Sequence, residues 1–98
     1  MNSLNVAKLP LYRCHKVVRA LKIKALEPCT GPASDHGAMI IPENPQDAGV
    51  ERFHVSRDFI EKLHPQDGGY YVIYEDGYRS YSPAAAFESG YTRIDHGR

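Results

Sequence analysis

The dipeptide Asp76-Gly77, set between two runs of aromatic and β-branched residues, constrains this chain more than any other feature. The flanking runs are 70–75 (YYVIYE) and 78–82 (YRSYS). An Asp-Gly pair favours a two-residue type I′ turn, because that turn needs positive φ at both central residues. We therefore predict a β-hairpin over residues 70–82.

The predicted turn also determines which side chains share a face of the hairpin. With two loop residues, Tyr74 lies opposite Arg79 and Val72 lies opposite Tyr81. The other face then pairs Ile73 with Ser80 and Glu75 with Tyr78.

Three further strands are predicted from short apolar patterns. Residues 17–25 (VVRALKIKA) alternate around Lys22 and Lys24, which predicts a half-buried strand with Ala25 on its apolar face. A short helix is the alternative there, because Val17 and Ala25 are also spaced at multiples of four residues. The runs 38–41 and 52–55 predict two short strands, separated by loops over 28–37 and 42–50.

Two helices are predicted from their end signals. Ser56 is a suitable N-cap for a helix over about 56–64, which Pro65 would end. Ser82 is predicted to cap a second helix over about 83–89, with Pro83 in its first position. Gly90 supplies the stop signal of that helix.

A chain of 98 residues has room for one domain. We predict a small α+β domain, mainly an antiparallel sheet, over residues 11–94. Residues 1–10 are expected to form a flexible leader and 95–98 a frayed tail. Residues 91–94 are expected to form a last short strand or an extended tail.

Charge is balanced overall but not along the chain. Lysine and arginine number 12, as do aspartate and glutamate, yet the first 26 residues hold six bases and no acid. These cations either pair with acids from the rest of the chain or form a basic face for an anionic partner. The members considered for a nucleic-acid contact are Arg13, Lys16, Arg19, Lys22 and Lys24.

No catalytic, metal or cofactor motif can be drawn from the sequence. The five histidines are scattered without helical metal-site spacing, and Cys14 and Cys29 form no Cys-x-x-Cys pair. We therefore predict no enzyme activity, no cofactor, no metal and free thiols. No apolar run approaches a membrane span, and the N-terminal residues do not resemble a secretory signal, so a cytoplasmic location is expected.

Tyrosine is the residue type that most suggests binding. Six of the seven tyrosines fall within residues 70–91, and the chain has no tryptophan. Exposed tyrosine beside arginine suits stacking on a planar ligand or anchoring at an interface. The alternative is that helix 83–89 or a second subunit covers this face. The predicted ligand or partner site comprises Tyr74, Tyr78, Arg79 and Tyr81.

The block 70–94 (YYVIYEDGYRSYSPAAAFESGYTRI), with 9–26 (LPLYRCHKVVRALKIKAL), resembles small, mostly uncharacterised proteins of tailed phages and prophages. The segments GAMIIPEN and FHVSRDFIEKLHPQDGGYY follow in the same order of blocks, so the resemblance spans about residues 9–94. It implies an accessory protein made in the bacterial cytoplasm. It supplies no catalytic residues.

Together these features predict a non-enzymatic phage accessory protein. It would inhibit a host protein or sequester a small host metabolite through the tyrosine-rich hairpin. The alternative is a nucleic-acid-associated protein that uses the basic segment 13–24. Open strand edges also favour a homodimer, because unpaired edges must be covered or paired.

Overall fold

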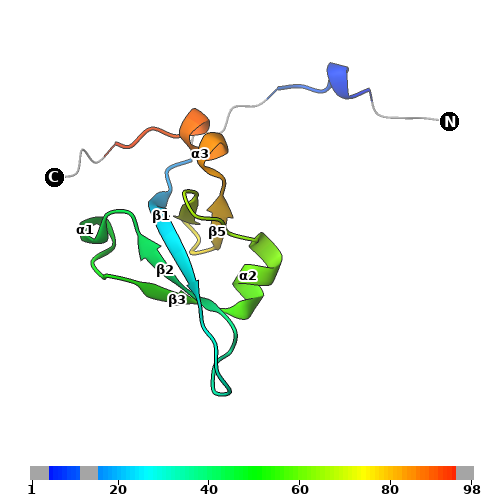
Figure 1. The fold of residues 1–98 in the computed structure, drawn as a ribbon. Helices are drawn as coiled ribbons and strands as arrows, with labels where there is room; N and C mark the ends of the chain where they lie inside the picture. Colours follow the sequence, from blue (N-terminus) through cyan, green and yellow to red (C-terminus); the bar gives the residue numbers. More distant parts are fainter. Residues whose placement is uncertain (1–4, 12–15, 95–98) are drawn as a thin grey trace.

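The computed structural model describes residues 5–11 and 16–94, which form a small α+β domain around one curled sheet (Figure 1). The five antiparallel strands have the order β3-β2-β1-β4-β5. The strands are β1 (Arg19–Pro28), β2 (Ala38–Pro42), β3 (Phe53–Val55), β4 (Tyr70–Ile73) and β5 (Arg79–Ser82). The helices are the 3-10 turn η1 (Val6–Lys8), α1 (Pro45–Ala48), α2 (Arg57–Leu63) and α3 (Ala84–Gly90). The predicted fold class is thus confirmed.

Strand β1 belongs to both halves of the sheet. Its first part pairs with β4 over residues 19–22, and its second part pairs with β2 over residues 23–28. A β-bulge between Ile23 and Ala25 lies at the start of the second part. A bulge bends a strand and increases its twist, so β1 can turn from one half of the sheet into the other.

The bulge also reverses the alternation of side chains along β1. Before it, Ile23 is fully buried; after it, Leu26 lies opposite the fully buried Ile40. Opposite residues of an antiparallel pair share a face, so Leu26 rather than Ala25 continues the inner face. The strand prediction for this segment is confirmed, but the face predicted for Ala25 is wrong because the extra residue shifts the register.

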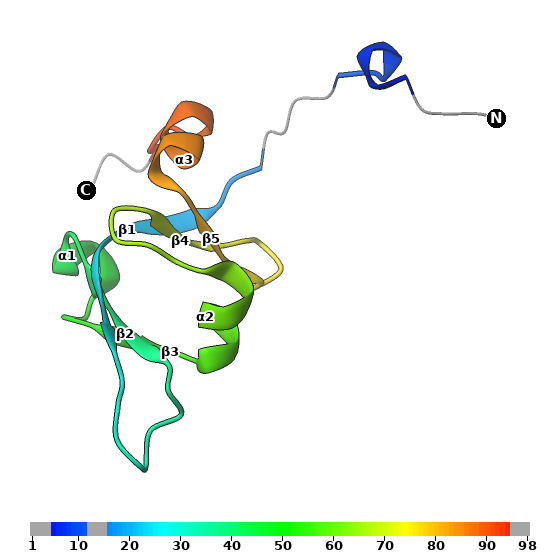
Figure 2. The ribbon, with the colours of Figure 1, turned by 45° about the vertical axis from the view of Figure 1, so that its right-hand side comes forward.

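The core lies inside the curl, with Tyr71 of β4 near its centre. Tyr71 is 6% exposed, and the centroid of its ring lies 4.9 Å from that of Phe53 on β3 and 5.5 Å from that of Phe59 on α2. Figure 2 shows α2 at the open side of the sheet, between β3 and the β4–β5 half. One aromatic side chain therefore connects both halves of the sheet with the helix.

Helix α2 begins and ends as predicted. The Ser56 hydroxyl accepts a hydrogen bond from the backbone N–H of Phe59 at 3.2 Å, and His64 follows the helix in the left-handed conformation. Helix α3 differs in detail, because Pro83 rather than Ser82 occupies the N-cap position and the Ser82 hydroxyl makes no cap bond. The expected loop 42–50 contains the short helix α1, capped by the side chain of Asn44.

The hairpin of β4 and β5 has a three-residue loop, so the predicted register is wrong by one residue. Tyr71 lies opposite Tyr81, and Ile73 lies opposite Arg79. At the loop, the N–H of Gly77 donates to the carbonyl of Tyr74 at 2.9 Å, and only Gly77 among the loop residues has positive φ. This pattern is a turn followed by a left-handed glycine, which the Asp-Gly pair also permits.

The slip of one residue exchanges the two faces of β5. Arg79 and Tyr81 lie on the inner face with Tyr71, whereas the outer face carries Tyr74 and Tyr78. The pairs predicted for Tyr74 with Arg79, Val72 with Tyr81, Ile73 with Ser80 and Glu75 with Tyr78 are therefore not formed.

Other expectations for the chain ends have mixed outcomes. The described residues 5–11 are exposed, and residues 91–94 form no strand. Cys29 is a free thiol. Cys14 and the tail 95–98 lie outside the described residues. The division of the chain into a leader, one domain and a tail stays a prediction.

Two glycines give a matched test of this packing. Gly69 is buried against Tyr81, and a Cβ there would overlap the tyrosine ring, whereas a Cβ on Gly90 at the end of α3 meets nothing within 4 Å. We expect Gly69→Ala to lower the free energy of unfolding by about 1–3 kcal/mol through overpacking. Gly90→Ala should raise it by up to about 1 kcal/mol through helix propensity.

Urea denaturation followed by circular dichroism measures both effects. Equal stability of Gly69→Ala and the unaltered chain would contradict the close approach of Tyr81 to the backbone at Gly69.

Candidate functional site

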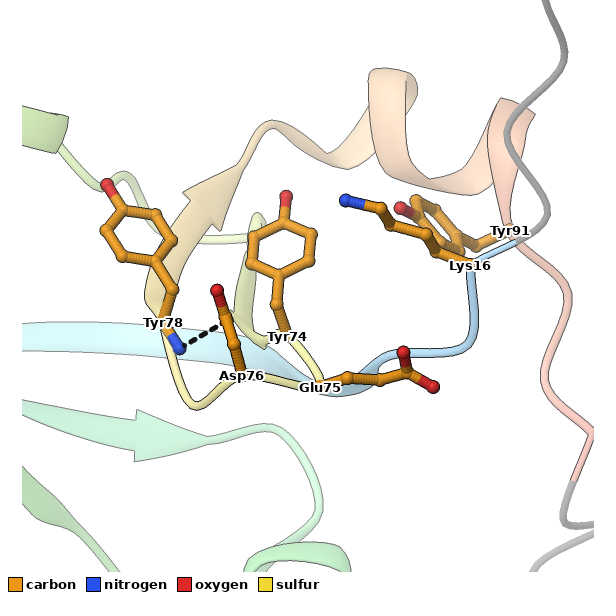
Figure 3. A pocket seen from close by; sticks show the side chains of 6 residues that line it. All are labelled: Lys16, Tyr74, Glu75, Asp76, Tyr78 and Tyr91. Carbon is orange, nitrogen blue, oxygen red and sulfur yellow. Dashed lines mark hydrogen bonds between the residues drawn. The ribbon is translucent and has the colours of Figure 1, made fainter.

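A hollow of about 510 Å³ at the tip of the β4–β5 hairpin is the candidate site (Figure 3). Its position on the outer face follows from the hairpin register described above. The lining side chains come from the segment before β1, from the hairpin loop and from the residue after α3. They are Lys16, Tyr74, Glu75, Asp76, Tyr78 and Tyr91.

The hairpin loop holds two tyrosines side by side in the hollow. The N–H of Tyr74 donates to the carbonyl of Tyr78 at 2.9 Å, and the Asp76 carboxylate accepts from the N–H of Tyr78 at 3.0 Å. These bonds place Tyr74 and Tyr78 opposite each other. Their ring centroids are 6.1 Å apart with an interplanar angle of 23°, and Tyr78 is 58% exposed.

Lys16 reaches the same hollow from the segment before β1. Its ammonium nitrogen lies 5.6 Å from the centroid of the Tyr74 ring, which is within the range of a cation–π contact (Figure 3). The ring thereby attracts a cation that lies 58 residues earlier in the chain. The sequence predicts Arg79 as the cation beside Tyr74, whereas in the structure that cation is Lys16.

Helix α3 bounds the hollow through a stack of three aromatic rings. Tyr70 and Phe87 stack with centroids 4.2 Å apart, and Phe87 and Tyr91 stack at 4.5 Å. The helix therefore covers Tyr70 on the outer face, as the alternative of a covering helix expected. The stack ends at Tyr91, so it does not extend over Tyr74 and Tyr78.

A polar cluster fastens α3 beside this stack. The carboxylate of Glu88 accepts a hydrogen bond from the Tyr70 hydroxyl at 2.8 Å and forms an ion pair with Lys22 at 3.1 Å. The bond from Tyr70, followed by the bond and charge of Lys22, holds the pKa of Glu88 below its ordinary value of 4.5. Burial, followed by the bond to Glu88, raises the pKa of Tyr70.

The structure divides the four residues predicted as a ligand site between two faces. Tyr74 and Tyr78 line the hollow. Tyr81 packs against the core, and the guanidinium of Arg79 donates to the Tyr71 hydroxyl at 3.0 Å. Ligand binding by any of the four stays a prediction, but they do not act as one cluster.

The basic segment is divided in the same way. Arg19 and Lys22 lie on opposite faces of β1, because they are three positions apart in a regular part of the strand. Lys22 pairs with Glu88, Lys16 lies over Tyr74, and Arg13 is outside the described residues. Lys24 is exposed at the bulge. These four described cations therefore form no single stripe, and their contact with nucleic acid stays a prediction.

Sequence reasoning missed three residues of the hollow. The sequence predicts Asp76 as a turn residue, Glu75 as a strand residue opposite Tyr78, and Tyr91 as part of a last strand or extended tail. The position of Gly90 as a helix stop is a usable signal, because it places Tyr91 directly after α3. The position of Lys16 has no local signal, because it depends on how the chain approaches β1.

Residues 5–11 and 16–94 offer no side-chain cluster for a metal ion and no helix that could span a membrane. No group of three or more His, Cys, Asp or Glu side chains in these ranges could hold a metal ion. The pair of His54 and Asp35, 3.0 Å apart, lies on the surface. In the same ranges, no helix has the length and apolar character needed to cross a membrane.

The hollow offers non-covalent contacts of three kinds. It presents aromatic faces, one cation and two carboxylates. Aromatic faces bind planar or cationic groups, and the carboxylates accept hydrogen bonds from basic ones. This combination suits the binding of a side chain of a partner.

Comparison with known proteins relates this fold to a phage protein. The chain is similar to the NMR solution structure of the monomeric form of the phage L decoration protein, with a TM-score of 0.57 and 28% sequence identity. The match covers 93% of this chain and 63% of that chain, so this chain spans less than two thirds of its length. No family model matches, and no curated protein matches. The expected resemblance to phage proteins is confirmed at that level, without a named family.

The cluster around Glu88 makes a prediction about pH. Because the pKa of Glu88 is lowered in the folded protein, its carboxylate stabilises the fold above about pH 4.5. That contribution is lost as the pH falls through the lower folded-state pKa. Glu88→Gln should therefore destabilise the protein at pH 7, and the difference from the unaltered chain should shrink as the pH falls toward 3.

Urea unfolding at a series of pH values measures this difference. The matched control is Glu51→Gln, because Glu51 is exposed and forms no ion pair within residues 5–11 and 16–94. A Glu88→Gln effect that is the same at pH 7 and pH 3 would show that the charge of Glu88 does not fasten α3.

Proposed function

We propose that this chain is a phage decoration protein, which binds to the outside of an assembled phage particle and catalyses no reaction. The observation that carries this proposal is the similarity to the phage L decoration protein, at 28% identity over 93% of this chain. Fold similarity alone is a weak guide to function. Here sequence identity accompanies the similarity of fold over almost the whole chain.

The exposed surface supports a binding role. Several large apolar side chains are exposed, and they lie before β1, at the hairpin tip, after α1 and after α3. They are Val6, Leu9, Leu11, Val17, Val50, Tyr78 and Ile94. Burial of apolar area against a partner is the main favourable contribution to most protein association. A protein that works on a particle surface would cover part of this area there.

The earlier hypotheses of a host protein target and of a sequestered metabolite stay predictions of the sequence. The tyrosine-rich hairpin on which they depend is divided between two faces, and no contact in the structure favours either target. Nucleic-acid association gains no support from the four described cations of the basic segment, because they share no single face.

A particle-binding experiment tests the proposed function. Particles of the phage or prophage that encodes the chain are prepared with its gene deleted, mixed with the purified chain and sedimented through a sucrose gradient. We expect saturable co-sedimentation at a fixed ratio to the major shell protein. Particles of an unrelated phage serve as the control.

Two results together would overturn the proposal. They are the absence of co-sedimentation over a wide concentration range, and the absence of the chain from purified particles of the undeleted phage by mass spectrometry. Recovery of the chain only with host proteins in the cell extract would return the host-protein hypothesis to first place.

A further inference from the structure

We propose that the hollow at the hairpin tip grips a basic side chain, an arginine above all, on the protein surface of the phage particle. This inference rests on the proposed function and names the part of the chain that makes the contact. It joins three observations: an exposed tyrosine, the Asp76 carboxylate bonded to the backbone N–H of that tyrosine, and an open hollow that Glu75 also lines.

The ring of Tyr78 is the aromatic group of the hollow that can accept a cation from a partner. Lys16 lies over Tyr74, whereas no cation of the described residues lies over Tyr78, which is 58% exposed. A guanidinium group stacks on an aromatic face through both its charge and its planar shape. Tyrosine and arginine are also the residue types that are enriched in the energetic centres of interfaces.

The charges of the hollow favour a basic partner. Glu75 and Asp76 outnumber the single cation Lys16 among the lining residues. One oxygen of Asp76 accepts the N–H of Tyr78, and Glu75 forms no ion pair or hydrogen bond within residues 5–11 and 16–94. The Asp76 carboxylate, next to Tyr78, can therefore accept a hydrogen bond from a guanidinium stacked on that ring, and Glu75 adds negative charge to the hollow. A phosphate or an acidic side chain would be repelled by the two carboxylates of Glu75 and Asp76.

The shape of the hollow favours a side chain on a large surface over a free small molecule. Glu75, Asp76 and Tyr78 are all exposed, and they lie at the tip of a hairpin (Figure 3). Small-molecule sites bury most of their ligand, which an open hollow cannot do. A protein surface that packs against the hairpin tip would exclude water from the hollow and so strengthen the contact.

Three altered chains test the inference in the particle-binding experiment. Tyr78→Ala removes the free ring and should weaken binding roughly ten-fold or more. Tyr78→Phe keeps the ring and should bind within about two-fold of the unaltered chain, since stacking does not need the hydroxyl. The double variant Glu75→Gln with Asp76→Asn removes both charges while it keeps an oxygen for the turn bond to Tyr78. It should weaken binding and reduce its dependence on salt.

A second double variant is the matched control for charge. Glu43→Gln with Glu51→Gln removes two exposed acids that do not line the hollow, and it should leave binding unchanged. Circular dichroism melting of every variant shows whether its fold is intact. Because Tyr78 is largely exposed, Tyr78→Ala should melt within a few degrees of the unaltered chain.

The outcomes separate this inference from the proposed function. If the unaltered chain does not bind particles, both are overturned. If it binds and the folded Tyr78→Ala variant binds equally well, this inference alone is overturned. If removing the charges of Glu75 and Asp76 tightens binding, the partner group is acidic, and the assignment of a basic side chain is wrong.

Discussion

The arrangement of this domain depends on one strand that serves two halves of a sheet. Strand β1 pairs with β4 up to Lys22 and with β2 from Ile23, and the bulge follows directly, so the bend there determines how the halves face each other. Because they face each other, Tyr71 of β4 reaches Phe53 of β3 and Phe59 of α2. Without the extra residue, Ile23 and Leu26 would lie on opposite faces of β1, and the two halves would not share one inner face.

Local sequence signals were sufficient to predict the helices and strands, but not to predict the register in which the strands pair. The alternation around Lys22 predicted β1, and Ser56 predicted the start of α2. The Asp76-Gly77 pair located the hairpin loop, but it fits loops of two and of three residues. Aromatic residues lie on both sides of the loop at odd and even positions, so hydrophobic pattern could not decide between the two registers.

The site was predictable only in part, because its members come together through the register and through distant segments. Tyr74 and Tyr78 were found from the richness of the hairpin in tyrosine. Arg79 was assigned to the wrong face, because the assumed loop was one residue too short. Lys16 lies over Tyr74 only because the chain passes the hairpin before it enters β1, which no local pattern encodes.

The length of α3 determines how much of the outer face of the hairpin is covered. The helix ends at Gly90, and the stack of Tyr70, Phe87 and Tyr91 ends with it. Tyr70 is thereby covered, and its hydroxyl is bonded to Glu88. Because the backbone is extended at Tyr91, α3 does not continue over the tip of the hairpin. The short helix therefore stabilises the base of the hairpin and leaves the aromatic tip open to a partner.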